Sequence, residues 1–274
     1  MSFRDLVLPA LLLLSVVPAR SATLLPLDSQ DAALLPTGVV ELTAGAERLV
    51  DFHPPFRDFD RREWAAPRIG IAAGLGSRAE VQATWEALHV EREIQGRRGS
   101  FEGSSSGDAR LFTKIRLLSA GDLRRSWVPD TGFLFGVKLP NTNERFGTDQ
   151  TDFFAHGLLA HTVPGGRLYA NLGIGVLGNP GLVRVQDDVF LWSIAASSAP
   201  LASWVGQPIS ALAEITGVEG SRFGNDRRGA RGGLRLGAAP LSAYLGGSVG
   251  FEPEGEDWGV RAGLIYELRA FSGS

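Results

Sequence analysis

The stretch of residues 257–268, DWGVRAGLIYEL, constrains the fold of this chain more than any other. From Trp258 onward its residues alternate, and one set is wholly apolar with an aromatic near each end, whereas the other carries Arg261 and Glu267. A period of two indicates a β-strand, and an apolar face opposite a charged face is typical of a strand between lipid and a polar lumen. Because a lone strand would leave backbone amides unsatisfied in lipid, the remaining chain must close a barrel around it.

Four residues of this stretch also have the spacing of an assembly signal. Arg261, Gly263, Tyr266 and Leu268 follow the order polar, glycine, aromatic, apolar. This order resembles the C-terminal signal by which outer-membrane barrel proteins are recognised for assembly. We therefore expect outer-membrane lipid and the barrel-assembly machinery to be partners of the chain.

The amino terminus has the features of an exported protein. Arg4 precedes an apolar run over residues 6–17, and small residues at positions 19 and 21 precede a cleavage point, as in a secretory signal peptide. A membrane anchor or a buried helix is the alternative, but the run is shorter than the roughly 20 residues of a spanning helix. We expect a signal peptide over 1–21, a periplasmic leader over 22–36 and one barrel over 37–271, in the outer membrane of a Gram-negative bacterium.

Alternating segments recur along the chain and predict the other strands. Short turns and longer polar connections follow one another, except at residues 119–126, and a change of parity near Pro208 predicts a bulge. This pattern predicts an all-β, antiparallel up-and-down barrel of about twelve strands, with periplasmic termini and long extracellular loops. A two-sheet sandwich would also alternate, but it explains neither the even count nor the difference between the two rims. The expected strands cover residues 38–49, 64–73, 79–87, 108–117, 127–139, 151–163, 167–176, 187–197, 202–218, 227–237, 241–251 and 257–268.

The amino-acid composition excludes some kinds of site and partner. The chain has no cysteine, which excludes disulfides, thiol catalysis and thiolate metal sites. Its net charge of -3 argues against a nucleic-acid partner, and 35 glycines with one methionine suit many strands and tight turns. We expect no cofactor and no metal.

Four short motifs resemble one known family. They are KLP at residues 138–140, GTDQTDF at 147–153, AEITG at 213–217 and DWGVRAGL at 257–264. Together they are similar to outer-membrane proteins of the MetA-pathway of phenol degradation family, over roughly residues 35–268. The family usually has a second glycine where this chain has Asp149 and Gln150. The resemblance implies an outer-membrane β-barrel and uptake of small solutes, aromatic or hydrophobic compounds among them.

The alternation also assigns charged residues to the lumen, with both signs present. A solute path lined by charge and an ion-pair network that rigidifies a closed barrel both fit this assignment. The lumen-lining candidates are Glu41, Glu47, Arg68, Glu80, Glu86, Arg110, Lys114, Arg116, Lys138, Asp152, Asn171, Glu214, Arg231, Arg235, Arg261 and Glu267.

Transport or diffusion of a small solute is the expected function, and no catalytic residue is assigned. A structural or adhesive barrel with partner-binding loops and a salt-bridged, closed lumen is the alternative, and a barrel hydrolase is a third. His156 and His161 are five residues apart, so they lie on opposite faces of one strand and share no metal.

Overall fold

The computed structural model describes residues 25–53, 60–93, 100–120, 127–142, 146–178, 186–222, 226–252 and 255–270. Within them no helix is long and apolar enough to cross a bilayer. The expected signal peptide lies outside the described residues. The strands are β1 (Val39–Phe52), β2 (Arg61–Gly74), β3 (Ala79–Glu93), β4 (Ser100–Ser106), β5 (Ala109–Leu118), β6 (Asp130–Leu139), β7 (Asp152–Val163), β8 (Gly166–Leu177), β9 (Asp187–Ser198), β10 (Ala202–Trp204), β11 (Gln207–Glu219), β12 (Arg227–Ala238), β13 (Leu241–Gly250) and β14 (Trp258–Arg269).

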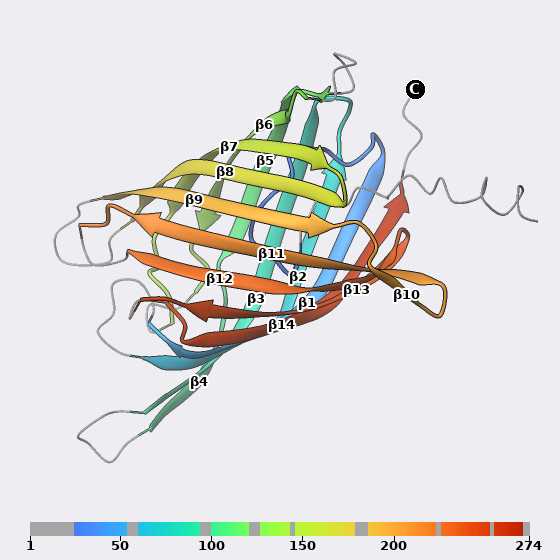
Figure 1. Cartoon of the computed structure of the whole chain (residues 1–274). Coiled ribbons are helices and arrows are strands. Elements are labelled where there is room, and N and C mark those ends of the chain that lie inside the picture. Colours follow the sequence, from blue (N-terminus) through green and yellow to red (C-terminus); the bar gives the residue numbers. More distant parts are fainter. Residues whose placement is uncertain are drawn as a thin grey trace, which may run out of the picture.

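All of these strands except β4 and β10 close into one antiparallel barrel of twelve strands (Figure 1). Neighbours along the chain pair with each other, β9 pairs with β11, and β14 pairs with β1. β4 extends a hairpin from the end of β3, and β10 forms a short hairpin with the start of β11. Closure leaves no open sheet edge around the ring. The predicted barrel is confirmed, and the sandwich is excluded.

The two ends of the barrel differ in their connections. β2 to β3, β7 to β8 and β12 to β13 are joined by a few residues at one end, which we call the short-turn end. β1 starts and β14 finishes at this end. The connections β1 to β2, β6 to β7, β8 to β9, β11 to β12 and β13 to β14 are longer and lie at the opposite, long-loop end. The β5 to β6 connection is longer than a tight turn, as the sequence predicted.

The outer wall is apolar, because alternate residues of each strand point away from the lumen. On β14, Trp258 and Leu264 are about half exposed, whereas Arg261 and Ile265 are buried. The same alternation gives exposed apolar residues on every side of the ring. They include Ile69, Ile71, Leu111, Phe133, Phe135, Phe153, Leu172, Ile174, Phe190, Ile194, Ile215, Leu234, Leu245, Val260 and Tyr266.

Two irregularities differ from the sequence prediction. Residues 202–218 do not form one bulged strand, because the chain reverses at Val205 and Gly206 between β10 and β11. Both residues have positive φ, 49° and 76°, as expected for the centre of a two-residue hairpin turn. A register shift lies instead in β2, between Ala65 and Arg68, on either side of Pro67. Proline cannot donate to the ladder and is therefore found at such irregular positions.

Candidate functional site

Residues 25–36 lie inside the barrel, and we call them the lumenal segment. Leu27, Ser29 and Ala32 are at most 2% exposed, although no strand includes them. The sequence analysis predicts that these residues belong to a periplasmic leader outside the barrel. The segment lies in the lumen instead, because its apolar side chains and its acidic groups both contact residues of the inner wall.

One carboxylate on β11 holds the middle of the lumenal segment. Glu214 accepts hydrogen bonds from the backbone N–H groups of Asp28 and Ser29 at 2.8 and 2.9 Å, and from the Ser29 hydroxyl at 2.6 Å. Asn171 of β8 accepts from the Gln30 N–H at 2.7 Å and donates to the Gln30 carbonyl at 2.9 Å. These contacts satisfy backbone groups that no strand pairing satisfies.

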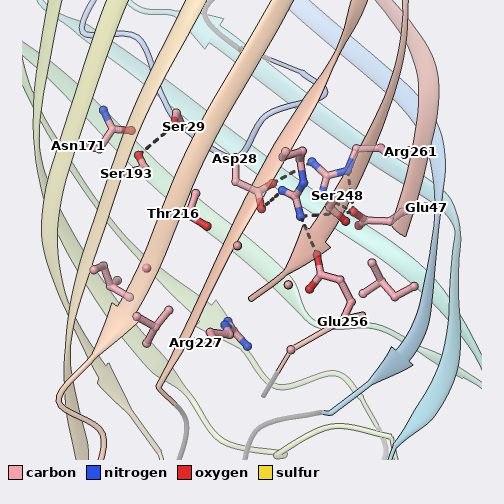
Figure 2. Close-up of a pocket in the computed structure, with 18 of the residues that line it drawn as sticks. Asp28, Ser29, Glu47, Asn171, Ser193, Thr216, Arg227, Ser248, Glu256 and Arg261 are labelled. Carbon is pink, nitrogen blue, oxygen red and sulfur yellow. Dashed lines mark hydrogen bonds and ion pairs between the residues drawn. The ribbon is translucent and has the colours of Figure 1, made fainter. Parts of the chain in front are cut away.

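An ion-pair network surrounds Asp28 (Figure 2). Arg261 of β14 contacts the Asp28 carboxylate at 2.8 Å and Glu47 of β1 at 2.7 Å. Arg231 of β12 also pairs with Asp28 and lies 3.6 Å from Glu256. The segment is thereby joined to three strands on one side of the barrel, and each of these charges has an opposite charge beside it, as buried ions require.

A second network holds the segment nearer the short-turn end. Lys114 Nζ lies 3.1 Å from Glu80 and donates to the carbonyls of Asp31 and Ala33 at 3.3 and 3.2 Å. The lysine and glutamate side chains are both fully buried. Arg167 of β8 contacts the Asp31 carboxylate through two nitrogens, at 3.1 and 2.9 Å. Such a two-point arginine–carboxylate contact fixes orientation as well as charge.

Apolar contacts complete the attachment. Leu27 and Ala32 pack in a buried cluster on inward-facing residues of the wall. Phe112 of β5 packs against the cluster. The wall residues of this cluster are Leu134, Leu158, Ala160, Tyr169, Ala195 and Leu212. The inner wall thus offers the segment apolar side chains of β6 to β11 as well as charged partners.

A cavity of about 490 Å³ lies in the long-loop half of the lumen, and we call it the vestibule. Asp28, Ser29 and Gln30 form part of its lining, so the lumenal segment bounds it. A smaller cavity of about 210 Å³ is lined by Leu25, Leu27, Asp28 and Gln30 together with strand residues that include Glu41 and Tyr244. The segment therefore contributes to the walls of both cavities.

A solved structure of similar shape identifies the fold. The translocator domain of autotransporter NalP from Neisseria meningitidis matches with a TM-score of 0.51 and 17% identity, over 84% of this chain and 88% of that chain. The fold is that of an outer-membrane β-barrel. The β domain of the Bordetella autotransporter BrkA has a TM-score of 0.42 and 13% identity, over 84% and 98% of the two chains. OmpF of Salmonella typhi in complex with daunomycin has a TM-score of 0.36 and 9% identity, over 84% and 97%.

Comparison of the sequence with known proteins assigns the chain to no family. No protein-family model matches the chain, and no curated protein matches it. The resemblance to the MetA-pathway of phenol degradation family therefore stays a prediction.

All of the predicted lumen residues are buried or half-buried in this outer-membrane barrel fold. The structure brings Glu47, Arg68, Glu86, Arg110, Glu214, Arg231 and Arg261 together around Asp28 and the vestibule. It keeps Lys138 and Asp152 apart from them, paired at 2.6 Å near the long-loop end. Those that are buried are Glu41, Glu47, Glu80, Lys114, Lys138, Asp152, Asn171, Glu214 and Arg261, and those that are half-buried are Arg68, Glu86, Arg110, Arg116, Arg231, Arg235 and Glu267.

The residues of the predicted assembly signal lie on both faces of β14. Arg261 points into the lumen, Tyr266 is 46% exposed on the outer wall, and Leu268 is half-buried. Gly263 lies beside the ring of Tyr244. Their role in assembly stays a prediction.

Sequence reasoning missed the lumenal segment as part of the site. The sequence signal for it was the mixture of Leu27, Ala32 and Leu35 with Asp28 and Asp31 in a stretch that lacks the alternation of a strand. The histidines form no joint site, because His156 lines the vestibule while His161 belongs to the outward set of β7. Among the described residues, no group of three or more histidine or carboxylate side chains could hold a metal ion.

Proposed function

We propose that this chain is exported to the outer membrane of a Gram-negative bacterium, where it admits a small solute through its lumen. The lumenal segment acts as a plug that moves before the solute passes. The single observation that supports this proposal is that the segment forms part of the walls of two cavities, of about 490 and 210 Å³. Displacement of the segment would join them along the barrel axis.

The attachment of the segment is compatible with such movement. Its polar contacts are hydrogen bonds and ion pairs to side chains, such as Glu214, Asn171 and Arg261, and it belongs to no strand, with a single bridge residue at Gln30. Water that entered the lumen could satisfy the same groups one at a time. The barrel wall has a complete ladder of its own and does not need the segment for closure. The sequence resemblance supports aromatic or hydrophobic compounds as the solutes.

A closed structural barrel is the second candidate, and the density of ion pairs around Asp28 favours it. In that case the lumenal segment would be a permanent part of the interior. The two functions differ in one property, which is whether the segment leaves its position.

A reversible lock on the segment tests the proposal. Ser29 Oγ lies 2.8 Å from Ser193 Oγ on β9, and the natural chain has no cysteine. The double variant Ser29→Cys/Ser193→Cys would therefore form one disulfide between the segment and the wall. Single-channel conductance of the refolded mature protein is then recorded in a planar bilayer, before and after reduction.

We expect discrete openings in the wild-type and in the reduced double variant, and their loss on oxidation. Each single cysteine variant is the matched control and should conduct under both conditions. Equal conductance in the oxidised and reduced double variant would exclude the segment as a plug. A wild-type protein that inserts and never conducts would favour the closed structural barrel.

A further inference from the structure

Arg227 differs from the other charged residues that line the vestibule. It is the first residue of β12, and its side chain projects into the cavity apart from the network around Asp28 (Figure 2). The guanidinium group makes no hydrogen bond or ion pair with any described residue. The carboxylate that acts on it most strongly is Glu256. Glu256 is already 3.6 Å from Arg231.

The carboxylates around the vestibule already have cationic partners. Glu47 contacts Arg261 at 2.7 Å, and Glu86 contacts Arg68 at 3.1 Å. Glu63 pairs with Arg61. Pairing thus accounts for the negative charge of the lining and leaves Arg227 as a cation without a partner among the described residues.

A second arginine lines the vestibule from the opposite wall. Arg110 is the second residue of β5, and β5 and β12 are six strands apart in either direction around the ring. Arg227 lies within electrostatic range of both Arg110 and Arg231. The ion pair of Arg110 is a weak one, with Glu86 at 3.8 Å, and its side chain is 38% exposed. Two cations that repel each other across a lumen are stabilised when an anion lies between them.

The cavity also has an apolar wall beside Arg110. Phe112 is two residues further along β5. Leu134 lies on the next strand, β6, where it pairs with His156 of β7. Phe112, Leu134 and His156 all line the vestibule. A site with a few convergent polar groups and an apolar surface is typical of small-molecule binding.

From these observations we propose that the vestibule is a binding site for a small organic anion. Its carboxylate lies between Arg227 and Arg110, and its hydrocarbon part lies on Phe112 and Leu134. This inference rests on the proposed uptake function and gives it a substrate class, namely monocarboxylates with a short apolar body. Guanidinium groups suit this role because their planar donors match the geometry of a carboxylate.

Binding to the refolded protein in detergent tests the site without any need for passage. Calorimetric titration compares hexanoate with hexan-1-ol, which has the same chain and no charge. We expect hexanoate to bind at least tenfold more tightly, and the preference to shrink as salt is added. Equal affinity for the two compounds would overturn the proposal.

Substitutions then locate the charge. Arg227→Gln should weaken hexanoate binding about tenfold and leave hexan-1-ol unchanged, whereas Arg227→Lys, which keeps the charge without the planar donors, should have an intermediate affinity. Arg269→Gln is the control, because it removes the same charge at the last residue of β14, which is exposed and does not line the vestibule. Heat-modifiable mobility on gel electrophoresis shows whether Arg227→Gln folds into a barrel. If it does not fold, Arg110→Gln takes its place, and the same tenfold loss of hexanoate affinity is expected. Unchanged hexanoate affinity in folded Arg227→Gln or Arg110→Gln protein would refute the site.

A flux assay separates this inference from the proposed function. Hexan-1-ol and protonated hexanoic acid cross lipid unaided, so the assay uses hexane-1-sulfonate, which has the same chain and a permanent charge, and glucose, which is neutral. Proteoliposomes, with protein-free liposomes as the blank, report whether either solute enters through the wild-type barrel. Tight hexanoate binding without entry of either solute would support the site and contradict uptake. Entry of both solutes at equal rates, without preferential hexanoate binding, would support uptake and contradict the site.

Discussion

Ser29 donates both its backbone N–H and its hydroxyl to the Glu214 carboxylate, at 2.9 and 2.6 Å, across 185 residues of sequence. The Asp28 N–H adds a third hydrogen bond to the same carboxylate at 2.8 Å. A single side chain of the wall thus orders two consecutive backbone amides of the lumenal segment. Glu214 is 3% exposed, so few water molecules could replace it while the segment is in place.

Replacement of this carboxylate should release the segment. Glu214→Ala leaves the Asp28 and Ser29 N–H groups without an acceptor, and each unsatisfied buried group costs about 1–3 kcal/mol. We expect the amides of Asp28 and Ser29 to exchange hydrogen at least about tenfold faster, because about 1.4 kcal/mol corresponds to a factor of ten. Hydrogen–deuterium exchange with mass spectrometry measures this on peptides that cover the segment.

Glu219→Ala on the same strand is the control for this experiment. Glu219 pairs with Arg228 and makes no contact with the segment. The Glu219→Ala variant should leave hydrogen exchange of residues 25–36 unchanged. Wild-type exchange in the Glu214→Ala protein would show that the other contacts hold the segment without this carboxylate.

The barrel could be predicted from sequence because lipid imposes a strict alternation on its strands. On β14, a slip of one residue would turn Arg261 outward and Val260 inward, so the parity has one solution. Parity also assigned the charged residues to the inner face. The alternation carries no information on height along the barrel axis, so it could not say that Glu47 and Arg261 are cross-strand neighbours.

The lumenal segment could not be predicted in the same way. Its contacts join Ser29 to Glu214 and Asp31 to Arg167, over separations that no local pattern encodes. The hairpin turn at Val205 was missed for a different reason. Valine is disfavoured at positive φ, so its presence argued against a turn there.

The buried pair of Lys114 and Glu80 should be sensitive to loss of one partner. Both side chains are fully buried, 3.1 Å apart, and Glu80 also accepts from the Leu35 N–H at 2.7 Å. Lys114→Met leaves the Glu80 charge uncompensated, which costs about 3–5 kcal/mol. Chemical unfolding of the refolded protein in detergent, followed by tryptophan fluorescence, measures the free energy of unfolding.

The double variant Lys114→Met/Glu80→Gln should recover most of this loss, since it removes both charges. Arg228→Met provides a comparison, because its pair with Glu219 is half exposed and ion pairs of this kind contribute little to stability. If Lys114→Met and Arg228→Met lower the free energy of unfolding equally, burial does not decide the strength of these ion pairs.

Strain at Val205 predicts a stabilising substitution. Its φ of 49° lies in the left-handed region, which a β-branched residue disfavours and asparagine tolerates. Val205→Asn should raise the free energy of unfolding by about 1 kcal/mol. Leu201→Asn, at another exposed site of the same hairpin without positive φ, is the control and should have no stabilising effect. The same unfolding titration measures both, and stabilisation by both would point to polarity of the hairpin instead of backbone strain.

Gly263, which belongs to the predicted assembly signal, also has a packing role. A Cβ added there would lie 2.5 Å from the Tyr244 hydroxyl and 2.7 Å from the ring carbon that bears it, and would contact the Ala44 carbonyl. Tyr244 is 6% exposed and fills the space that the glycine leaves, so its ring cannot move far. Gly263→Ala should therefore destabilise the refolded barrel by about 1–3 kcal/mol.

Unfolding in detergent separates packing from recognition, because no assembly machinery is present. Gly157→Ala is the control, since a Cβ at that position would find no atom nearer than 3.8 Å. Addition of Tyr244→Ala to Gly263→Ala should recover the part of the loss that comes from the ring, which a double-mutant cycle measures. If Gly263→Ala leaves the unfolding free energy at the wild-type value and impairs only assembly in cells, the glycine acts as a recognition residue and the packing argument is wrong.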